Sequence, residues 1–308
     1  MITKLKKLWG VASRAIKFDR RLDEIKINQG RILAALNRDA GYPSLDGYSF
    51  KVFSQWGEDG IIQFLTEALS VQNRTFIEFG VEDFSESNCR FLLMKDNWRG
   101  FVVDGSPKNV QKIKDSYYFW QYDLQAEAAF IDRDNVDGIL VRSGFDPEVG
   151  ILSVDIDGVD YHVLERLGRW KASIIIVEYN PVFGHERPVS VPYDPTFWRG
   201  RAHHSNLYYG ANLPAFDHLL TARGYAFIGV NQQRSNGFYV RKELLNDRVR
   251  AADFGQFRQD STFRESRNEA GGLTHLAMAD RQRLIGDLPV VDVRTGEALK
   301  VSDLSRRS

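Results

Sequence analysis

Residues 150–158 read GILSVDIDG, and residues 172–180 read ASIIIVEYN. Each segment is a continuous apolar run that ends in polar residues. Strands that are buried on both faces of a parallel sheet have this pattern. The two runs therefore predict interior strands of one sheet. The polar residues at their carboxyl ends are Asp155, Asp157, Glu178 and Asn180.

Strand-like and helix-like segments alternate on both sides of these two runs. The expected strands are 74–80, 100–106 and 117–124 before them, and 225–231 and 236–242 after them. The expected helices between strands are 53–69, 88–97, 109–116 and 213–224. This alternation predicts right-handed βαβ units and an open, doubly wound sheet. The last two strands, joined by the turn QQRSNG, are expected to form an antiparallel hairpin at its edge.

Composition excludes several classes of protein. The 308 residues are 43% hydrophobic and 27% charged, and 41 Lys and Arg balance 41 Asp and Glu, so no overall charge indicates a nucleic-acid partner. The single Cys89 excludes an internal disulfide framework and is expected in the core. No stretch reaches the roughly 18 apolar residues that span a bilayer, and the basic start lacks a secretory core. A cytoplasmic protein is expected.

Residues 1–40 differ from the rest of the chain and are expected to form a basic, amphipathic helical leader. Its apolar residues at helical spacing are Ile2, Leu5, Trp9, Ala12 and Ile16. Two interpretations stay open: residues 1–20 contact the inner membrane face peripherally, or the leader packs on the body or on a partner. A homo-oligomer is a separate open expectation. Leu22, Ile25, Ile32 and Leu36 could continue the helix as a short coiled-coil seam, but they cover too few heptads to establish one. The expected α/β domain covers residues 48–245, and residues 246–308 are expected to pack on it.

Ligands of an open parallel sheet bind beyond the carboxyl ends of its strands. The polar groups expected at the first three strand ends are Glu78 with Gly80, then Asp104, then Asp123. The first of these loops is acidic and has one glycine, which argues against a pyrophosphate and favours a cofactor that carries a sulfonium cation. Asp104 can accept both hydroxyls of a ribose, although Asp-Gly-Ser is also a good turn.

Six segments carry a resemblance to a known family. They are SQWGEDG (54–60), FIEFGVEDFSESN (76–88), NWRGFVVDGS (97–106), LSVDIDGVDY (152–161), IVEYNPVFG (176–184) and SNLYYGA (205–211). From about Phe53 to Lys242 the chain resembles a bacterial subgroup of the FkbM-like, S-adenosylmethionine-dependent methyltransferases. A weaker likeness continues through FRESRNEAGGLTHL (263–276).

The resemblance implies a fold and a set of roles. The fold is the class I methyltransferase fold, a Rossmann-like sheet of seven strands with the last strand antiparallel. Glu78 and Gly80 would form the loop on the methionine side of the cofactor, Asp104 would hold the ribose, and Asp123 would lie near the adenine amino group. The chain departs from the usual glycine-rich first loop by placing Glu82, Asp83 and Phe84 there.

The DxDG motif at residues 155–158 suggests a metal site. Carboxylate and amide oxygens suit Mg²⁺ or another hard divalent cation. The pattern is similar to that of catechol-type O-methyltransferases, in which Asp and Asn at these two strand ends bind the metal. Asp157 and Asn180 are the preferred ligands, with Glu178 beside them, because residues two apart on a strand point the same way. The alternative is structural, with Asp157 in a turn and Asp155 capping the next helix.

His203, His204 and Asp155 are the candidate catalytic residues. A histidine near the pocket can take a proton from a hydroxyl, although a loop histidine is more often a surface residue. The connection 184–206 is long enough to be a lid, and Trp198 within it can stack on a sugar ring. Arg264 and Arg267 could clamp an anionic group of a substrate, or belong to a solvated charge run.

These patterns and the resemblance together predict a methyltransferase. The resemblance alone implies that the acceptor is an oxygen of a sugar or sugar-containing metabolite. Two alternatives stay open. A metal-dependent hydrolase or lyase acting on a phosphorylated sugar would use the same acidic strand ends. A non-catalytic assembly component would use the leader to reach a membrane.

Overall fold

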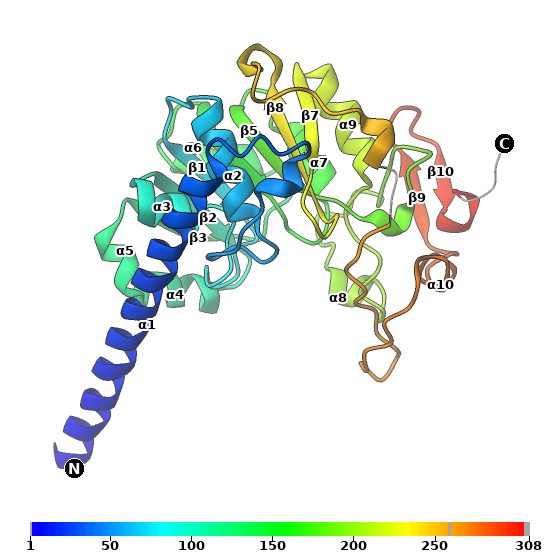
Figure 1. The fold of residues 1–308 in the computed structure, drawn as a ribbon. Coiled ribbons are helices and arrows are strands. Elements are labelled where there is room, and N and C mark those ends of the chain that lie inside the picture. The colour runs from blue at the N-terminus through cyan, green and yellow to red at the C-terminus, as the bar shows by residue number, and fades with distance from the viewer. Residues whose placement is uncertain (1, 258–259, 305–308) are drawn as a thin grey trace.

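The computed structural model describes residues 2–257 and 260–304 and, within its first helix, the side chains from Phe18 onward. Its centre is a seven-stranded sheet with the order β3-β2-β1-β4-β5-β8-β7 (Figure 1). The strands are β1 (Thr75–Phe79), β2 (Arg99–Asp104), β3 (Leu124–Ala128), β4 (Glu148–Val154), β5 (Lys171–Glu178), β7 (Tyr225–Val230) and β8 (Asn236–Arg241). In the described part of the chain, no helix has the length and apolar character needed to cross a membrane.

The strand directions confirm the predicted fold class. Strands β1 to β5 run parallel to one another, and β8 pairs antiparallel with both β5 and β7. The last strand is thus antiparallel, as expected, but it is inserted between β5 and β7 and does not form the edge. This is the class I methyltransferase arrangement. The strand order reverses between β1 and β4, so the ligand site of the fold is expected there.

Helices cover both faces of the sheet (Figure 1). They are α1 (Ile2–Asn37), α2 (Glu58–Ala68), α3 (Arg90–Asp96), α4 (Pro107–Asp115), α5 (Tyr117–Gln121), α6 (Val136–Arg142), α7 (Asp160–Arg166), α8 (Arg199–Ala202), α9 (Leu213–Ala222) and α10 (Met278–Leu284). The strand residues alternate between two buried clusters. One cluster joins them to α1 through α5, and the other joins them to α6, α7 and α9. Cys89 is fully buried in the first cluster, as predicted.

The third predicted strand is wrong in its position. Tyr117–Gln121 is the helix α5, and β3 begins only at Leu124. The aromatic residues that favoured a strand fit a short helix because Tyr118 turns into the core, where its ring packs against Phe84. Asp123 therefore precedes β3 and does not follow it.

The first predicted helix starts later than expected. Residues 53–57 form a loop, and α2 begins at Glu58 after Gly57, which has a φ of 94°. The loop is held from inside the helix, because the carboxylate of Asp59 accepts hydrogen bonds from the backbone N–H groups of Val52, Phe53 and Ser54 at 2.7–2.8 Å. A periodic pattern alone does not reveal this contact.

The C-terminal segment adds a second, three-stranded sheet of order β10-β9-β6. Its strands are β6 (Val189–Ser190), β9 (Pro289–Asp292) and β10 (Ala298–Lys300). Since β6 belongs to the long connection after β5, this sheet ties the C-terminal segment to that connection. A third buried cluster, which includes Val189 and Val290, lies at this junction.

Helix α1 packs on the body through its C-terminal part, and its N-terminal part projects away from the body (Figure 1). Ile27, Gly30 and Ala34 are buried, and a Cβ on Gly30 would lie 2.6 Å from Val52. The ion pair between Asp23 and Arg90, at 2.6 Å, fixes the helix further. The residues of the predicted amphipathic face, Ile2, Leu5, Trp9, Ala12 and Ile16, have side chains outside those that the structure describes.

Candidate functional site

A cavity of about 710 Å³ lies beyond the carboxyl ends of β1, β2, β4 and β5. Its size is typical of sites for small molecules and cofactors. Its charged lining residues are mostly acidic. The carboxylate residues that line it are Glu78, Glu82, Glu86, Asp104, Asp155, Asp157, Glu178 and Glu265, and Arg199 is the one cationic residue among the lining residues that the structure describes.

Gly80 occupies the point where the strand order reverses. Its φ of 73° lies in the left-handed region, and a Cβ built on it would be 1.5 Å from the carbonyl oxygen of Asp155. Only glycine allows the loops after β1 and β4 to approach so closely. The backbone of the first loop therefore borders the cavity directly.

Glu78 lies on β1 at the bottom of the cavity and is 4% exposed. Its carboxylate accepts hydrogen bonds from the Ser87 hydroxyl at 2.7 Å and from the backbone N–H groups of Asn88 and Cys89 at 2.7 and 3.2 Å. Burial raises the pKa of Glu78 to about 7, although these hydrogen bonds oppose the shift. The residue therefore titrates near neutral pH.

Asp104 ends β2 and lines the cavity beside Gly80. One carboxylate oxygen accepts from the backbone N–H of Glu82 at 2.8 Å, and the other accepts from Ser106 N–H at 2.8 Å and from the Asn109 amide. The turn role and the site role that the sequence left open are both compatible with this geometry. Each carboxylate oxygen can accept more than one hydrogen bond, so capacity remains for a ligand.

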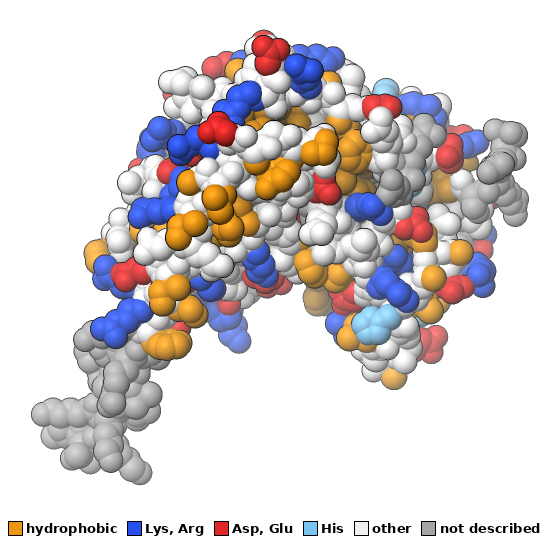
Figure 2. Space-filling model, viewed as in Figure 1, with side chains coloured by type: hydrophobic (Ala, Val, Ile, Leu, Met, Phe, Trp, Pro, Cys, Tyr) orange, Lys and Arg blue, Asp and Glu red, His pale blue; other side chains and the backbone are white. Residues whose placement is uncertain are grey.

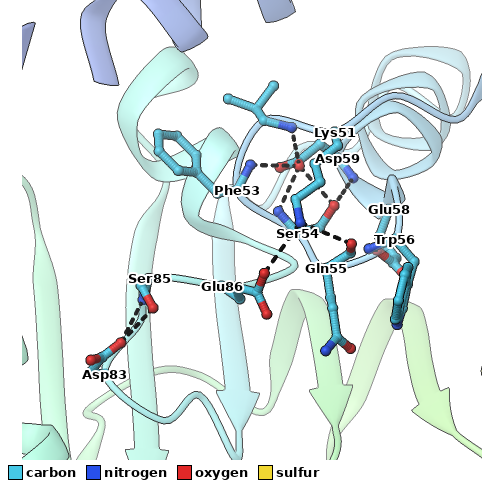
Figure 3. Close-up of polar contacts among 11 residues, drawn as sticks. Lys51, Phe53, Ser54, Gln55, Trp56, Glu58, Asp59, Asp83, Ser85 and Glu86 are labelled. Carbon is cyan, nitrogen blue, oxygen red and sulfur yellow. Dashed lines mark hydrogen bonds and ion pairs between the residues drawn. The ribbon is translucent and has the colours of Figure 1, made fainter. Parts of the chain in front are cut away.

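The loop 51–57 contributes a part of the site that sequence reasoning missed. Figure 3 shows Asp59 drawing the backbone of this loop together, while the Gln55 side chain points away from Asp59. Gln55 lines the cavity. Lys51 holds Glu86, another lining residue, at 3.2 Å. The SQWGEDG motif could have suggested that this loop is ordered near the site, because its two carboxylates begin a helix directly after a glycine.

Three carboxylates cluster on the β4–β5 side of the cavity. Asp155, Asp157 and Glu178 each offer an oxygen, and these oxygens lie within 4.8 Å of one another. Asp155 and Glu178 therefore interact directly. Burial, followed by the neighbouring negative charges, holds the pKa of both groups well above the usual range. The pair therefore keeps a proton under conditions in which ordinary carboxyl groups have lost theirs.

Arg199 is the second residue that the sequence did not indicate. Its guanidinium bonds Asp157, donates to the carbonyl of Asn206 at 2.8 Å, and stacks on the Tyr209 ring at 3.9 Å. Arg199 lies in the connection 184–206. The unusual length of this connection was the only feature of the sequence that pointed to a role for its residues. Trp198, from the same connection, lines the cavity and is 55% exposed, so it is available to a ring-shaped ligand.

Asn180, one of the two preferred metal ligands, does not line the cavity. Asn180 is fully buried and its side chain is committed: its amide donates to the carbonyls of Leu207 and Tyr209, and its oxygen accepts from Val182 N–H. The alternation argument failed because β4 and β5 end at Val154 and Glu178, before the residues in question. Asp155 takes the place expected for Asn180 in the cluster.

Asp123 lies at the opposite end of the sheet from the cavity. It precedes β3 and forms an exposed ion pair with Arg99 at 2.6 Å, at the start of β2. The segment that follows β3 supplies Ala129, Phe130 and Ile131 to the cavity lining instead. The prediction that Asp123 follows the third strand is wrong, and its cause is the misplaced strand.

The predicted histidines lie outside the cavity lining. His203 Nδ1 is 2.7 Å from the Ser205 hydroxyl, and burial lowers the pKa of His203. The rings of His203 and His204 pack against each other with centroids 4.2 Å apart. Arg264 and Arg267 are also engaged elsewhere, with the carbonyl of His275 and with Glu265.

The alternative in which Asp155 caps the helix after β4 is not what the structure shows. Asp160, not Asp155, organises this loop, because its carboxylate accepts from the backbone N–H groups of Ile156 and Gly158 at 2.7 and 2.9 Å. Burial raises the pKa of Asp160 to about 6. Asp155 is thereby free of capping and faces the cavity.

Comparisons with known proteins give distant structural likenesses. No family model and no curated protein matches the chain. The N-terminal domain of EvdMO1 with SAH bound is 10% identical, with a TM-score of 0.38 over 72% of this chain and 94% of that one. A putative O-methyltransferase from Klebsiella pneumoniae is 11% identical, with a TM-score of 0.40 over 68% and 87%. The O-methyltransferase from Bacillus cereus in complex with SAH is 13% identical, with a TM-score of 0.38 over 70% and 88%. At this distance the fold assignment rests on the strand order itself.

Proposed function

We propose that this protein is an S-adenosylmethionine-dependent methyltransferase that acts on an oxygen of a sugar or sugar-containing metabolite. The observation that carries the proposal is the position of Asp104. It ends β2 and lines the cavity next to Gly80, at the reversal of a class I methyltransferase sheet. The sugar acceptor and the FkbM-like subgroup follow from the sequence resemblance, and Trp198 at the cavity mouth is compatible with a ring-shaped acceptor.

The residues of the cavity fit the cofactor. Bound S-adenosylmethionine supplies a methyl group on a sulfonium cation. An acidic cavity favours such a cation and disfavours a dinucleotide or nucleoside triphosphate, whose phosphates need a positive site. The absence of a side chain at Gly80 leaves room for close approach to the backbone of the loop.

Residues of the chain divide into two groups. Asp104 would accept the ribose hydroxyls, and Glu78 with Gly80 would border the methionine portion. On the other side, Asp155 and Glu178 would orient the acceptor. The pair keeps one proton, so the carboxylate of the pair that carries none would take the proton of the acceptor. Arg199 would hold Asp157 in place. Catalysis would depend mainly on proximity and orientation.

A divalent cation remains a second candidate ligand of the site. Asp155, Asp157 and Glu178 form an oxygen-rich set, and Glu178 Oε2 lacks a hydrogen-bond partner among the described residues. Arg199 competes with a cation for Asp157. A bound cation would orient two hydroxyls of an acceptor. Cation binding is therefore included in the test.

Isothermal titration with S-adenosylmethionine and S-adenosylhomocysteine, with and without Mg²⁺, tests the cofactor. We expect dissociation constants on the order of micromolar, or about −8 kcal/mol. Asp104→Ala should abolish binding. Asp123→Ala is the matched control, because it removes the same side chain at the other end of the sheet and should bind like the wild type. Absence of wild-type binding under all conditions would overturn the proposal and favour the metal-dependent hydrolase.

The chemical step is separated from binding by a second pair of variants. Asp155→Asn should bind S-adenosylmethionine normally and lose transfer to a panel of sugars by about 100-fold or more, the range typical of a lost general base. His203→Ala should retain transfer within about twofold of the wild type, because His203 does not line the cavity. The opposite result would restore His203 as the base.

A further inference from the structure

Helix α1 has two apolar faces, and only one of them is covered. Ile27, Gly30 and Ala34 face the body. Five large apolar side chains on the other side are exposed: Phe18 by 67%, Leu22 by 41%, Ile25 by 63%, Ile32 by 63% and Leu36 by 69%. Figure 2 shows hydrophobic side chains along the described part of this helix, where it leaves the body.

The exposed residues follow a heptad repeat. Steps of four and three residues lead from Phe18 through Leu22, Ile25, Gln29 and Ile32 to Leu36. The sequence continues the same steps toward the N-terminus with Leu8, Val11 and Ala15, whose side chains lie outside those described. In heptad notation the a positions are Leu8, Ala15, Leu22, Gln29 and Leu36, and the d positions are Val11, Phe18, Ile25 and Ile32. Sustained a and d positions of this kind form coiled-coil seams.

We propose that this seam binds the same seam of a second copy of the chain, in a parallel, in-register, two-stranded coiled coil. Gln29 decides the alignment. It is the polar residue among the a and d positions, and a buried amide needs a hydrogen-bonding partner. Parallel alignment in register places Gln29 opposite Gln29 of the second copy, whereas an antiparallel alignment of the seam places it opposite Phe18. One polar a position specifies register in this way.

Flanking charges support the parallel orientation. The g positions along the seam are the basic Lys7, Arg14 and Arg21 and the neutral Asn28. In the parallel pair Arg14 meets Asp19, at an e position of the second copy. Arg21 meets Lys26, a like-charge pair at the solvent-exposed edge that salt screens.

The body limits the number of strands to two. Leu at a with Ile at d favours more than two strands in isolated coiled coils. Here, however, Leu33 at an e position packs against the core of its own chain, and Ile27 and Ala34 cover the side opposite the seam. One neighbouring helix fits on the remaining face. The 29-residue seam is about 43 Å long. With a helix width of about 10 Å its footprint is roughly 430 Å² per partner, about half of the roughly 800 Å² that a standard stable interface buries.

A membrane surface fits this face less well than a second copy. A lipid-bound helix has a broad apolar face bordered by basic residues. The exposed seam is narrow, is interrupted by Gln29, and has the acidic Asp19 among the residues that border it.

Sedimentation equilibrium of the full chain tests the association. The wild type should have twice the mass of one chain. Ile25→Glu should weaken the dimer by at least about 100-fold, because it places a charge in the seam. Arg31→Glu is the matched control, since it introduces the same residue at an exposed position off the seam, and it should remain dimeric. Circular dichroism should show both variants folded, because neither side chain is buried in the single chain.

Cross-linking tests the register. Cys89 is fully buried, so a cysteine introduced on the surface is the only accessible thiol among the described residues. Gln29→Cys should form a disulfide-linked dimer on mild oxidation, and Arg31→Cys should not. A monomeric wild type, a trimer or tetramer, or a dimer in which Gln29→Cys fails to cross-link would overturn the proposal. A monomer that binds phosphatidylserine vesicles through residues 1–37 would replace it with the membrane interpretation.

Discussion

At the scale of single residues, the site depends on a backbone contact that leaves no room for a side chain. Gly80 combines a φ of 73° with a carbonyl oxygen where its Cβ would be. Such a position is easily overlooked, since glycine contributes no chemistry of its own. It sets the distance between the loops after β1 and β4, and hence the geometry of the cavity.

Gly80→Ala should destabilise the protein by about 4 kcal/mol or more, the range of severe steric substitutions. Gly144→Ala is the control that separates the steric clash of a Cβ from the strain of a left-handed backbone. Gly144 has a similar φ of 68°, and nothing lies within 4 Å of a Cβ built on it. That control should cost about 1 to 2 kcal/mol, the price of left-handed backbone alone. Urea unfolding of both variants measures the difference, and equal losses would contradict the close contact.

We expect Glu78 to make cofactor binding depend on pH. Its pKa of about 7 means that the carboxyl group is protonated below that pH and charged above it. A cationic cofactor prefers the charged form, so affinity should rise several-fold between about pH 6 and about pH 8, and binding should release a proton. Titrations in buffers of different ionisation enthalpy measure this release.

The matching variants isolate Glu78 from other titrating groups. Glu78→Gln should flatten the pH dependence, whereas Glu148→Gln, an exposed carboxylate at the start of β4, should leave it unchanged. A pH dependence that survives in Glu78→Gln would assign it to Asp155, Asp160 or Glu178.

At this scale, the sequence predicted residues well where a buried strand ended in a carboxylate. Glu78, Asp104, Asp155, Asp157 and Glu178 all line the cavity. Asn180 could not be excluded in advance, since its partners are carbonyls some thirty residues away in sequence. Arg199 and Gln55 come from loops, whose paths no periodic pattern specifies.

At the scale of elements, one buried ion pair joins α1 to the body. Asp23 on α1 accepts from Arg90 at 2.6 Å and from the Tyr117 hydroxyl at 2.7 Å. The Arg90 guanidinium also lies between the rings of Phe53 and Tyr118, at 4.2 and 4.4 Å from their centroids. Four segments far apart in the sequence therefore meet at this single contact.

Asp23→Ala should destabilise the protein by about 3 to 5 kcal/mol, because Arg90 would remain buried without its partner. Glu24→Ala is the control on the same helix, where an exposed pair with Arg20 contributes about 0.5 kcal/mol or less. Urea unfolding measures both changes. Hydrogen exchange in α1 should also accelerate in Asp23→Ala alone, and an equal effect of the two variants would contradict the special role of this pair.

The elements themselves were predictable where hydrophobic periodicity is strong. Strands β1, β2, β4, β5, β7 and β8 appear where the sequence indicated them. The segment 117–124 was misread because aromatic residues favour strands in general, while here tertiary packing of Tyr118 selects a helix. That one error displaced Asp123 from one end of the sheet to the other.

At the scale of the whole molecule, the sequence predicted the sheet, but it did not predict which face of helix α1 packs on the body. Four apolar residues of α1 suggested a coiled coil before the structure separated its covered face from its exposed one. The structure added that distinction, because only packing against α2 and α3 identifies which apolar residues are free.

The thermal stability of a dimer joined through α1 should depend on protein concentration. Association stabilises the folded state by mass action, so the melting temperature should rise over a hundredfold increase in concentration. Calorimetry of the wild type and of Ile25→Glu measures the effect. The variant should melt at a constant temperature, and a constant temperature in the wild type would contradict the dimer.

The insertion of β8 between β5 and β7 has a consequence for synthesis on the ribosome. Until residues 236–241 have left the exit tunnel, β5 has no partner on one side, and β7 cannot join the sheet at all. Open strand edges of this kind pair readily with other chains. The nascent protein therefore carries an aggregation-prone edge until about four-fifths of it has left the exit tunnel, and holdase chaperones should engage it during that interval.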